Sequence, residues 1–256
     1  MSGIKDVARR ANVSISTVSR VLNDSCPVNE EKRRRVEEAV RELNYVPNPA
    51  ARSLLLRRTG TLGVVIPFAS GEFFSEFLSG VDQTAADRDH FLLISISHRS
   101  ESDLAEAIRN LDKRVDGLVV WAPEMKAAHV RTLVDETTPL LILNTSEPDS
   151  ISDFIDFDNY GGMSQIVTYL VDIGHREFAF VGGPSSASDA QQRLQAYRDT
   201  LSARGLVPTP EREFEGKFRF EDGYQAARQV LAMSPRPTAL IASNDQTAFG
   251  VLTALR

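Results

Sequence analysis

Five side chains between positions 15 and 20 carry groups that could read the edges of DNA base pairs. They are Ile15, Ser16, Thr17, Ser19 and Arg20. Arginine can donate two hydrogen bonds to guanine, hydroxyls can contact phosphates, and an aliphatic side chain can contact the methyl group of thymine. On one face of a helix, this set suits the major groove of double-stranded DNA.

Apolar residues around this set predict two short helices that would position it. They stand at positions 4, 7, 8 and 11, and a matching spacing returns at 18, 21 and 22, after a break at Asn12. Each series gives a helix one apolar face, and Ser14 stands where an N-cap residue accepts the free amides of the second helix. Two such helices joined by a tight turn predict a helix-turn-helix. The spacing alone also fits two amphipathic helices of any small bundle.

The charge of the chain is divided unequally. Residues 1–60 carry 12 Lys and Arg against 7 Asp and Glu, a net charge of +5, whereas residues 61–256 carry 17 against 28, a net charge of −11. A basic module on an acidic body is expected where only that end meets a polyphosphate. The run Lys32-Arg33-Arg34-Arg35 lies in a third predicted helix that opens at Asn29, and we interpret it as the solvated face of that helix.

Two prolines, Pro47 and Pro49, break the chain after the third helix. The residues that follow, 50–58, predict a helix that is too short to be stable alone, so we expect it to form only when paired or bound. A plain linker would explain the prolines but not the leucines at 54–56. We assign residues 1–46 to a helix-turn-helix domain and 47–60 to a hinge helix and linker.

From Thr61 onward, apolar runs alternate with helical stretches, which predicts an α/β fold with buried parallel strands. One series covers about residues 61–158 and a second covers about 159–256, so we expect two doubly wound lobes. Open sheets of this kind bind ligands at the carboxyl ends of their strands. The predicted ligand site therefore lies in a cleft between the lobes.

Other classes of protein find little support in the sequence. The chain has one cysteine, Cys26, a polar N-terminus and no apolar stretch of membrane-spanning length, so we expect a cytoplasmic protein without a membrane partner. It lacks nucleophile-elbow, phosphate-loop and dinucleotide motifs, and its four histidines have no metal-ligand spacing. We therefore expect neither an enzyme nor a cofactor or metal.

Several segments resemble the lactose-repressor/galactose-repressor family of bacterial transcription regulators. The most specific is Val13-Ser-Ile-Ser-Thr-Val-Ser-Arg-Val-Leu-Asn23. The others are Ile4-Lys-Asp-Val-Ala8, Tyr45-Val-Pro-Asn48, Ala51-Arg-Ser-Leu54, Arg114-Val-Asp-Gly-Leu118, Phe157-Asp-Asn-Tyr-Gly161, Gly174-His-Arg176, Arg236-Pro-Thr238 and Ser243-Asn-Asp245. The resemblance implies a three-helix DNA-binding module followed by a two-lobed domain like that of periplasmic binding proteins. It also implies a homodimeric repressor of operator DNA whose affinity is controlled by a small-molecule effector, a sugar or sugar derivative; a purine would suit the same groups.

The resemblance further implies which residues contact DNA. Ile15 and Ser16 would read bases together with Arg20, and Leu54 would wedge into the minor groove and kink the operator. The full implied set is Ser14, Ile15, Ser16, Thr17, Ser19, Arg20, Asn23, Asn48, Ala51 and Leu54.

The implied effector site lies in the second domain. Arg193 would grip the ligand and Phe218 would stack on it. The full implied set is Phe73, Phe74, Trp121, Asn144, Asp189, Arg193, Phe218, Asn244 and Asp245. The aromatic residues of the first lobe could instead be core residues, and Arg193 a surface arginine. Asn144 stands where many members of the family have aspartate, so a ligand hydroxyl would be bound differently there.

Two rival interpretations stay open. A sugar-binding receptor, exported or cytosolic, would share the two-lobed body, although the basic N-terminal module and the missing signal peptide argue against export. Family members continue beyond the position of Arg256, so we expect an incomplete second lobe, and a truncated repressor fragment without ligand response is the other alternative.

Overall fold

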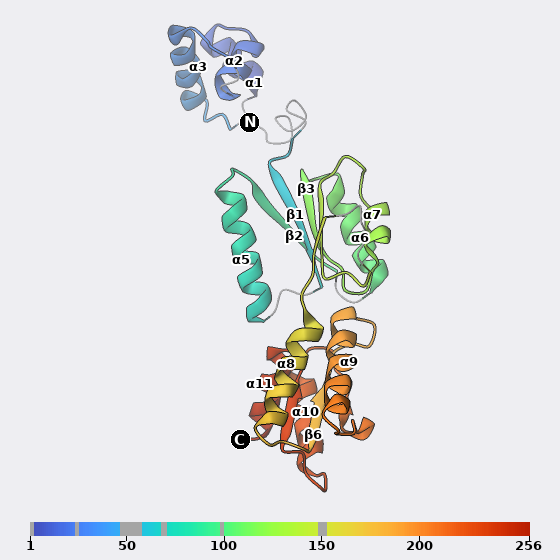
Figure 1. Cartoon of the computed structure of the whole chain (residues 1–256). Helices are drawn as coiled ribbons and strands as arrows, with labels where there is room; N and C mark the ends of the chain where they lie inside the picture. The colour runs from blue at the N-terminus through green and yellow to red at the C-terminus, as the bar shows by residue number, and fades with distance from the viewer. Residues whose placement is uncertain (1–2, 24–25, 47–57, 68–70, 98–99, 148–152) are drawn as a thin grey trace. The chain divides into compact units, whose positions relative to one another are not determined.

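The structure is a computed structural model that describes residues 3–23, 26–46, 58–67, 71–97, 100–147 and 153–256. The chain divides into two compact units, Met1–Thr59 and Gly60–Arg256, and Figure 1 shows the helices and strands of each. Each unit has its own hydrophobic core, so each is described by itself.

The first unit is a three-helix module. Its helices are α1 (Ile4–Ala11), α2 (Ile15–Asn23) and α3 (Glu30–Glu42). Val7, Val18 and Val36, one from each helix, are fully buried in a shared core. Asn12 ends α1 in the left-handed conformation, with φ 49°, which turns the chain directly into α2. The predicted helix-turn-helix is confirmed.

The first lobe of the second unit contains a five-stranded parallel sheet in the order β2-β1-β3-β4-β5. The strands are β1 (Thr61–Ile66), β2 (Phe91–Ile96), β3 (Gly117–Trp121), β4 (Leu140–Leu143) and β5 (Asp153–Ile155). The helices of this lobe are α5 (Glu72–Ala86), α6 (Glu101–Asp112) and α7 (Ala127–Thr132). Each parallel pair requires a crossover connection, which explains why strand and helix alternate along the sequence.

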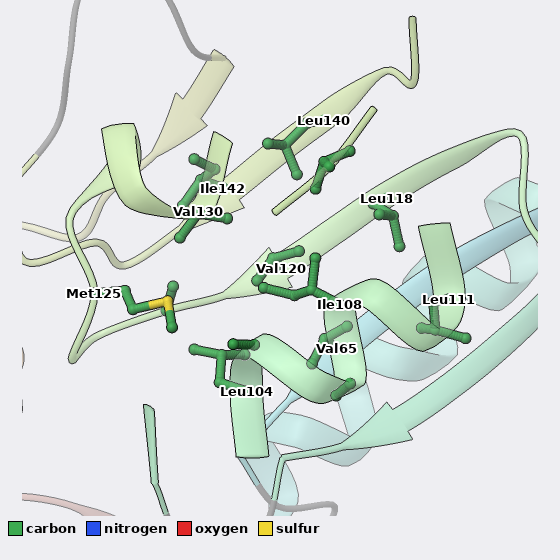
Figure 2. Packing of buried hydrophobic residues seen from close by; sticks show 14 of the residues in the cluster. Val65, Leu104, Ile108, Leu111, Leu118, Val120, Met125, Val130, Leu140 and Ile142 are labelled. Atoms are coloured by element: carbon green, nitrogen blue, oxygen red, sulfur yellow. The ribbon is translucent and has the colours of Figure 1, made fainter. Parts of the chain in front are cut away.

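The two faces of this sheet are covered by different helices (Figure 1). Alternate residues of a strand point to opposite faces: Val65 packs with α6 and α7, whereas Val64 and Ile66 pack with α5. Figure 2 shows the α6 and α7 side, where Ile108 and Val130 pack on Val65 and on residues of β3 and β4. Because the central strands β1, β3 and β4 are largely buried on both faces, their ends are the part of the sheet at which polar side chains can gather.

The second lobe repeats this plan around a three-stranded parallel sheet in the order β7-β6-β8. Its strands are β6 (Phe178–Val181), β7 (Glu213–Phe214) and β8 (Ala239–Ala242). Its helices are α8 (Asn159–Asp172), α9 (Ser188–Ala203), α10 (Phe220–Leu231) and α11 (Asp245–Ala254), with a 3-10 helix η1 (Pro210–Arg212) before β7. Helices α8 and α9 pack on the face that carries Phe178 and Phe180, and α10 and α11 pack on the face that carries Val181.

The predicted fold class, an N-terminal helix-turn-helix followed by a two-lobed α/β domain, is confirmed. Strand β5 was not predicted, because its three residues are all exposed and its sequence, Asp-Phe-Ile, has too little length for a pattern. None of the helices in the described part of the chain is both long enough and apolar enough to cross a bilayer.

Candidate DNA interface and ligand site

Helix α2 buries its valines and turns a mixed polar and aliphatic face outward. Val18 and Val21 lie in the core of the module, whereas the side chain of Ile15 is 45% exposed. Ser16 and Arg20 are exposed as well. An isoleucine left in solvent beside an arginine adds nothing to the core, which favours a role in contact with another molecule.

Three hydroxyl groups gather at the start of α2. The Oγ of Ser14 accepts a hydrogen bond from the backbone amide of Thr17 at 3.2 Å. The same Oγ lies 2.8 Å from Ser16 Oγ and 2.9 Å from Thr17 Oγ1. The N-cap role expected of Ser14 is therefore present, and it fixes all three hydroxyls at the positive end of the helix dipole, where phosphate binding is favoured.

The end of α2 carries the next two candidate DNA contacts, which bond to each other. The Nδ2 of Asn23 donates to the carbonyl oxygen of Ser19 at 2.9 Å and to its Oγ at 3.3 Å. If either side chain bound a phosphate, that contact would replace these hydrogen bonds. The remaining candidates, Asn48, Ala51 and Leu54, lie outside the described residues.

The interpretation of residues 32–35 as a solvated face is wrong for Arg35. Its Nε and Nη2 donate to the carbonyl oxygen of Ala11 at 2.9 and 2.6 Å, and Nη2 also donates to that of Asn12 at 2.7 Å. Sequence spacing could not show this, because the carbonyls lie more than twenty residues away from the arginine.

In the second unit, Arg193 is the centre of a polar cluster. The Oδ1 of Asn159 accepts hydrogen bonds from Arg193 Nε at 2.9 Å and Nη2 at 2.7 Å. Arg193 Nη1 donates to the carbonyl oxygen of Ser243 at 2.6 Å. The Asp189 carboxylate lies one helical turn earlier, 3.6 Å from Nη2. Arg193 is thus held by residues from α8, from α9 and from the end of β8, rather than lying free on the surface.

Asp189 connects this cluster to the first lobe. Burial raises the pKa of its carboxyl group, the positive charge of Arg193 opposes that rise, and the side chain of Asn144 opposes it less strongly. Asn144 follows β4 and is only 1% exposed. The backbone also joins the lobes here, because the amide of Ser188 donates to the carbonyl oxygen of Pro123 at 3.1 Å.

Several polar atoms in this part of the molecule are enclosed without a partner. Among the described residues, the amide oxygen of Asn144 and the hydroxyls of Ser188, Ser243 and Thr247 are buried and make no hydrogen bond. Buried polar groups are nearly always paired with protein or ordered water, so each exception needs an explanation. Asn144, Ser188 and Ser243 all adjoin the Asp189–Arg193 pair.

An aromatic cluster lies beside these polar groups in the first lobe. The ring of Trp121 lies 5.5 Å from that of Phe73, 5.2 Å from that of Phe74 and 5.5 Å from that of Phe157, measured between centroids. Phe74 and Trp121 are buried in the core, whereas Phe73 and Phe157 are partly exposed. Asn159 links the two clusters, because its Nδ2 donates to the carbonyl oxygen of Phe157 at 3.1 Å.

Phe218 is fixed in an unusual conformation, with φ 59°. Asn244 Nδ2 donates to its carbonyl oxygen at 3.1 Å, while Asn244 Oδ1 accepts from the amide of Thr247 at 3.1 Å. Both ends of the Asn244 amide are thereby engaged within the protein, in holding Phe218 and capping α11. Asp245 is exposed, and its carboxylate forms no hydrogen bond or ion pair with the described residues.

The cluster includes residues that the site prediction missed. Asn159 and Ser243 hold Arg193, and Phe157 packs on Trp121. All three stand in segments already singled out as body motifs, Phe157-Asp-Asn-Tyr-Gly161 and Ser243-Asn-Asp245. The signal was present, but motif position alone does not reveal which side chain reaches the arginine.

Comparison with protein families gives two matches that together span nearly the whole chain. Residues 3–48 match the family described as bacterial regulatory proteins, lacI family. Residues 59–256 match the periplasmic binding proteins and sugar binding domain of LacI family. The second match alone covers more than half of the chain.

Known proteins show the same relationship. The ribose operon repressor of Escherichia coli K12 is 36% identical over 261 residues, which cover 100% of this chain and 78% of that protein. The transcriptional repressor PurR of Pasteurella multocida is 30% identical, covering 100% and 77%. A crystal structure of the Lac repressor dimer bound to operator and the anti-inducer ONPF superposes with a TM-score of 0.85 at 30% identity, covering 99% of this chain and 77% of that one.

The helix-turn-helix, the two-lobed α/β domain and these matches agree with the resemblance seen in the sequence. The chain belongs to the LacI family of bacterial regulatory proteins and is a DNA-binding transcription regulator.

Proposed function

We propose that the chain represses transcription by placing the exposed face of α2 in the major groove of an operator. Ile15, Ser16 and Arg20 would contact base edges, and the hydroxyls of Ser14 and Thr17 would contact phosphates. Support comes from the exposure of Ser14, Ile15, Ser16 and Arg20, beside a half-buried Thr17, at a helix whose other side is anchored by buried valines. In this proposal, residues 1–46 form the DNA-binding domain, 47–60 the hinge and 61–256 the effector-binding domain, in a protein of the cytoplasm.

The remaining proposed DNA contacts have less structural support. Ser19 and Asn23 would give up their mutual hydrogen bonds to bind phosphates. The proposed contacts of Asn48, Ala51 and Leu54 depend on the sequence resemblance alone.

The DNA assignment can be tested on a site selected in vitro from random-sequence DNA with the parent protein. Arg20→Ala is expected to weaken binding to that site by about 1–3 kcal/mol and to relax the preference at one base step. Arg41→Ala, an exposed arginine of α3, is the matched control and should keep the sequence preference. Equal loss on every DNA sequence for Arg20→Ala would contradict a base-reading role.

We further propose that two copies bind together, as in the Lac repressor dimer. Strand β2 is an edge of its sheet and carries exposed apolar side chains, with Phe91 78% exposed and Leu93 and Ile94 partly so. An exposed apolar edge strand favours pairing with another chain. Phe91→Lys should shift sedimentation toward the monomer, whereas Val207→Lys, at a residue that is also highly exposed, should not. If both variants sediment as the parent does, β2 is not the contact.

The effector that suits the polar cluster best is a small sugar or sugar derivative held between the lobes by Arg193. The single observation that carries this proposal is the set of enclosed, unpartnered groups on Asn144, Ser188 and Ser243. Amides and hydroxyls both donate and accept, as sugar hydroxyls do. The rings of Phe73, Trp121 and Phe218 supply the apolar surfaces that such a site also needs.

Titration calorimetry of the full chain tests the effector site. Because a relative at 36% identity is named as a ribose operon repressor, D-ribose is the first probe. Arg193→Lys should weaken sugar binding at least tenfold, because lysine cannot reproduce the planar fork of donors. Arg204→Lys, an arginine at the exposed end of α9, is the control. Unchanged affinity in Arg193→Lys would remove Arg193 from the site.

A further inference from the structure

Arg35 of α3 turns its side chain toward the end of α1, so it is not among the side chains proposed to enter the groove. Its guanidinium makes three hydrogen bonds of 2.6–2.9 Å to the carbonyl oxygens of Ala11 and Asn12. These carbonyls lie in the turn between α1 and α2. We propose that Arg35 is a positioning residue, which fixes that turn and thereby the orientation of α2 on the operator.

The carbonyls that Arg35 contacts belong to the end of a helix, where the helix itself supplies no donors. The last carbonyl groups of an α-helix have no intrahelical partner, and a cation there also interacts favourably with the helix dipole. The backbone amides of Asn12 and Val13 donate hydrogen bonds to the carbonyl oxygens of Arg9 and Ala8, one turn earlier. They leave the carbonyls of Ala11 and Asn12 to Arg35. Ala11 is 3% exposed with Arg35 in place, so the guanidinium takes the place of water as the partner of its carbonyl oxygen.

The position of the turn between α1 and α2 determines how the exposed side chains at the start of α2 are oriented. Only two residues separate Asn12 from Ile15, and Ser14 between them caps α2. A change at Asn12 is therefore passed directly to the start of α2, where Ile15 and Ser16 are exposed. Arg35 comes from α3, so its bonds tie the turn to a helix that is otherwise distant in the sequence.

The neighbouring arginines of α3 provide a contrast. Arg34 is exposed, and its Nε lies 3.9 Å from Glu38 one turn later on the same helix. A substitution at Arg34 removes the same charge from almost the same place without touching the turn. The Arg34 substitution therefore separates the effect of losing the Arg35 hydrogen bonds from the effect of losing one positive charge.

The test compares Arg35→Ala, Arg35→Lys and Arg34→Ala in the full chain. Binding is measured to the site selected in vitro with the parent and to random-sequence DNA, at several salt concentrations. Arg35→Ala should weaken binding to the selected site about tenfold or more while binding to random DNA changes less than about threefold, and the dependence of log affinity on log salt should keep its slope. Arg34→Ala should leave the ratio of the two affinities unchanged.

Arg35→Lys keeps the charge and the aliphatic stem but loses the fork of donors. It should fall between the parent and Arg35→Ala in the ratio of specific to random binding, while circular dichroism at the assay temperature shows the parent's helix content. This variant decides the matter if Arg35→Ala fails to fold.

Two results would overturn the proposal. If Arg35→Ala or Arg35→Lys weakened binding to both DNAs equally, with the salt slope of Arg35→Ala reduced by about one, Arg35 would be a direct phosphate contact instead. If Arg35→Lys matched the parent in the affinity ratio, the three hydrogen bonds would have no part in sequence reading.

Discussion

The guanidinium carbon of Arg193 lies 5.7 Å from the centroid of the Phe218 ring. At that distance the charge is attracted by the face of the ring. The ring is held there by two unrelated features: the bond from Asn244 to the Phe218 carbonyl, and close packing of the ring on Gly183. The proposed ligand site is therefore shaped by residues that need not touch the ligand.

Gly183→Ala should weaken sugar binding through Phe218. A methyl group at position 183 would overlap the Phe218 ring, because the ring packs directly on the glycine. The ring must then move relative to Arg193, and we expect an affinity loss of about twofold to fivefold, since an exposed cation–π contact is worth about 0.5–1 kcal/mol. Titration calorimetry measures it. The control is Gly162→Ala in α8, where a methyl group meets open space; an equal loss in both variants would rule out this explanation.

Ser14→Ala should lower both stability and operator affinity. Loss of an N-cap serine costs about 1 kcal/mol, and Ser16 and Thr17 lose the oxygen that fixes their hydroxyls. Thermal unfolding and DNA binding measure the two effects. Ser100→Ala is the matched control, because Ser100 caps α6 by accepting from the amide of Asp103 at 3.1 Å. It should destabilise the second unit by a similar amount and leave DNA affinity unchanged; a DNA defect there would show that general destabilisation suffices.

Gly223→Ala and Gly250→Ala should each destabilise the second lobe. A methyl group at Gly223 would overlap the backbone of Thr247, and one at Gly250 would overlap that of Phe220. Helices α10 and α11 would have to separate, and overpacking of this kind costs about 1–3 kcal/mol. Urea unfolding measures it. Gly80→Ala in α5 meets open space and should instead stabilise by about 0.5–1 kcal/mol. Similar shifts in all three variants would mean that the helices have room to adjust.

Asp189→Asn should change how stability depends on pH in the ligand-free protein. Burial raises the pKa of Asp189 above its usual value of 3.8, so the folded state binds this proton more tightly than the unfolded state does. The parent should therefore lose stability relative to the variant as the pH rises from about that usual value through the raised pKa, and the difference should stay constant above it. Urea unfolding between acid and neutral pH measures the difference. A difference that is constant across the range, or grows in the opposite direction, would contradict the effect of burial.

The sequence predicted the elements more completely than the contacts between them. Strand β1 and helix α2 follow from periodicity, which depends only on neighbouring residues. The three bonds of Arg35 and the grip of Asn159 on Arg193 each join residues more than twenty positions apart. Such contacts depend on how elements pack, and a residue type with several uses, such as arginine on a charged helix, does not reveal which use it has.

The aromatic residues illustrate the same limit. Phe73, Phe74 and Trp121 could have been either core or ligand contacts, and the structure places Phe74 and Trp121 in the core and leaves Phe73 partly exposed at its edge. A single apolar cluster can close a core and also form the wall of a site. Sequence composition cannot separate these uses, because burial by protein and burial by ligand favour the same side chains.

Strand β1 pairs on one side with β3, so that Leu62 lies opposite Gly117, far along the chain. Contacts over such separations form slowly, whereas helices joined by short turns form their contacts within microseconds to milliseconds. A chain emerging from the ribosome at about 5–20 residues per second would complete α1, α2 and α3 several seconds before β3 reaches solution. The nascent polypeptide is thus expected to acquire its helix-turn-helix while the partner strands of β1 are still being synthesised.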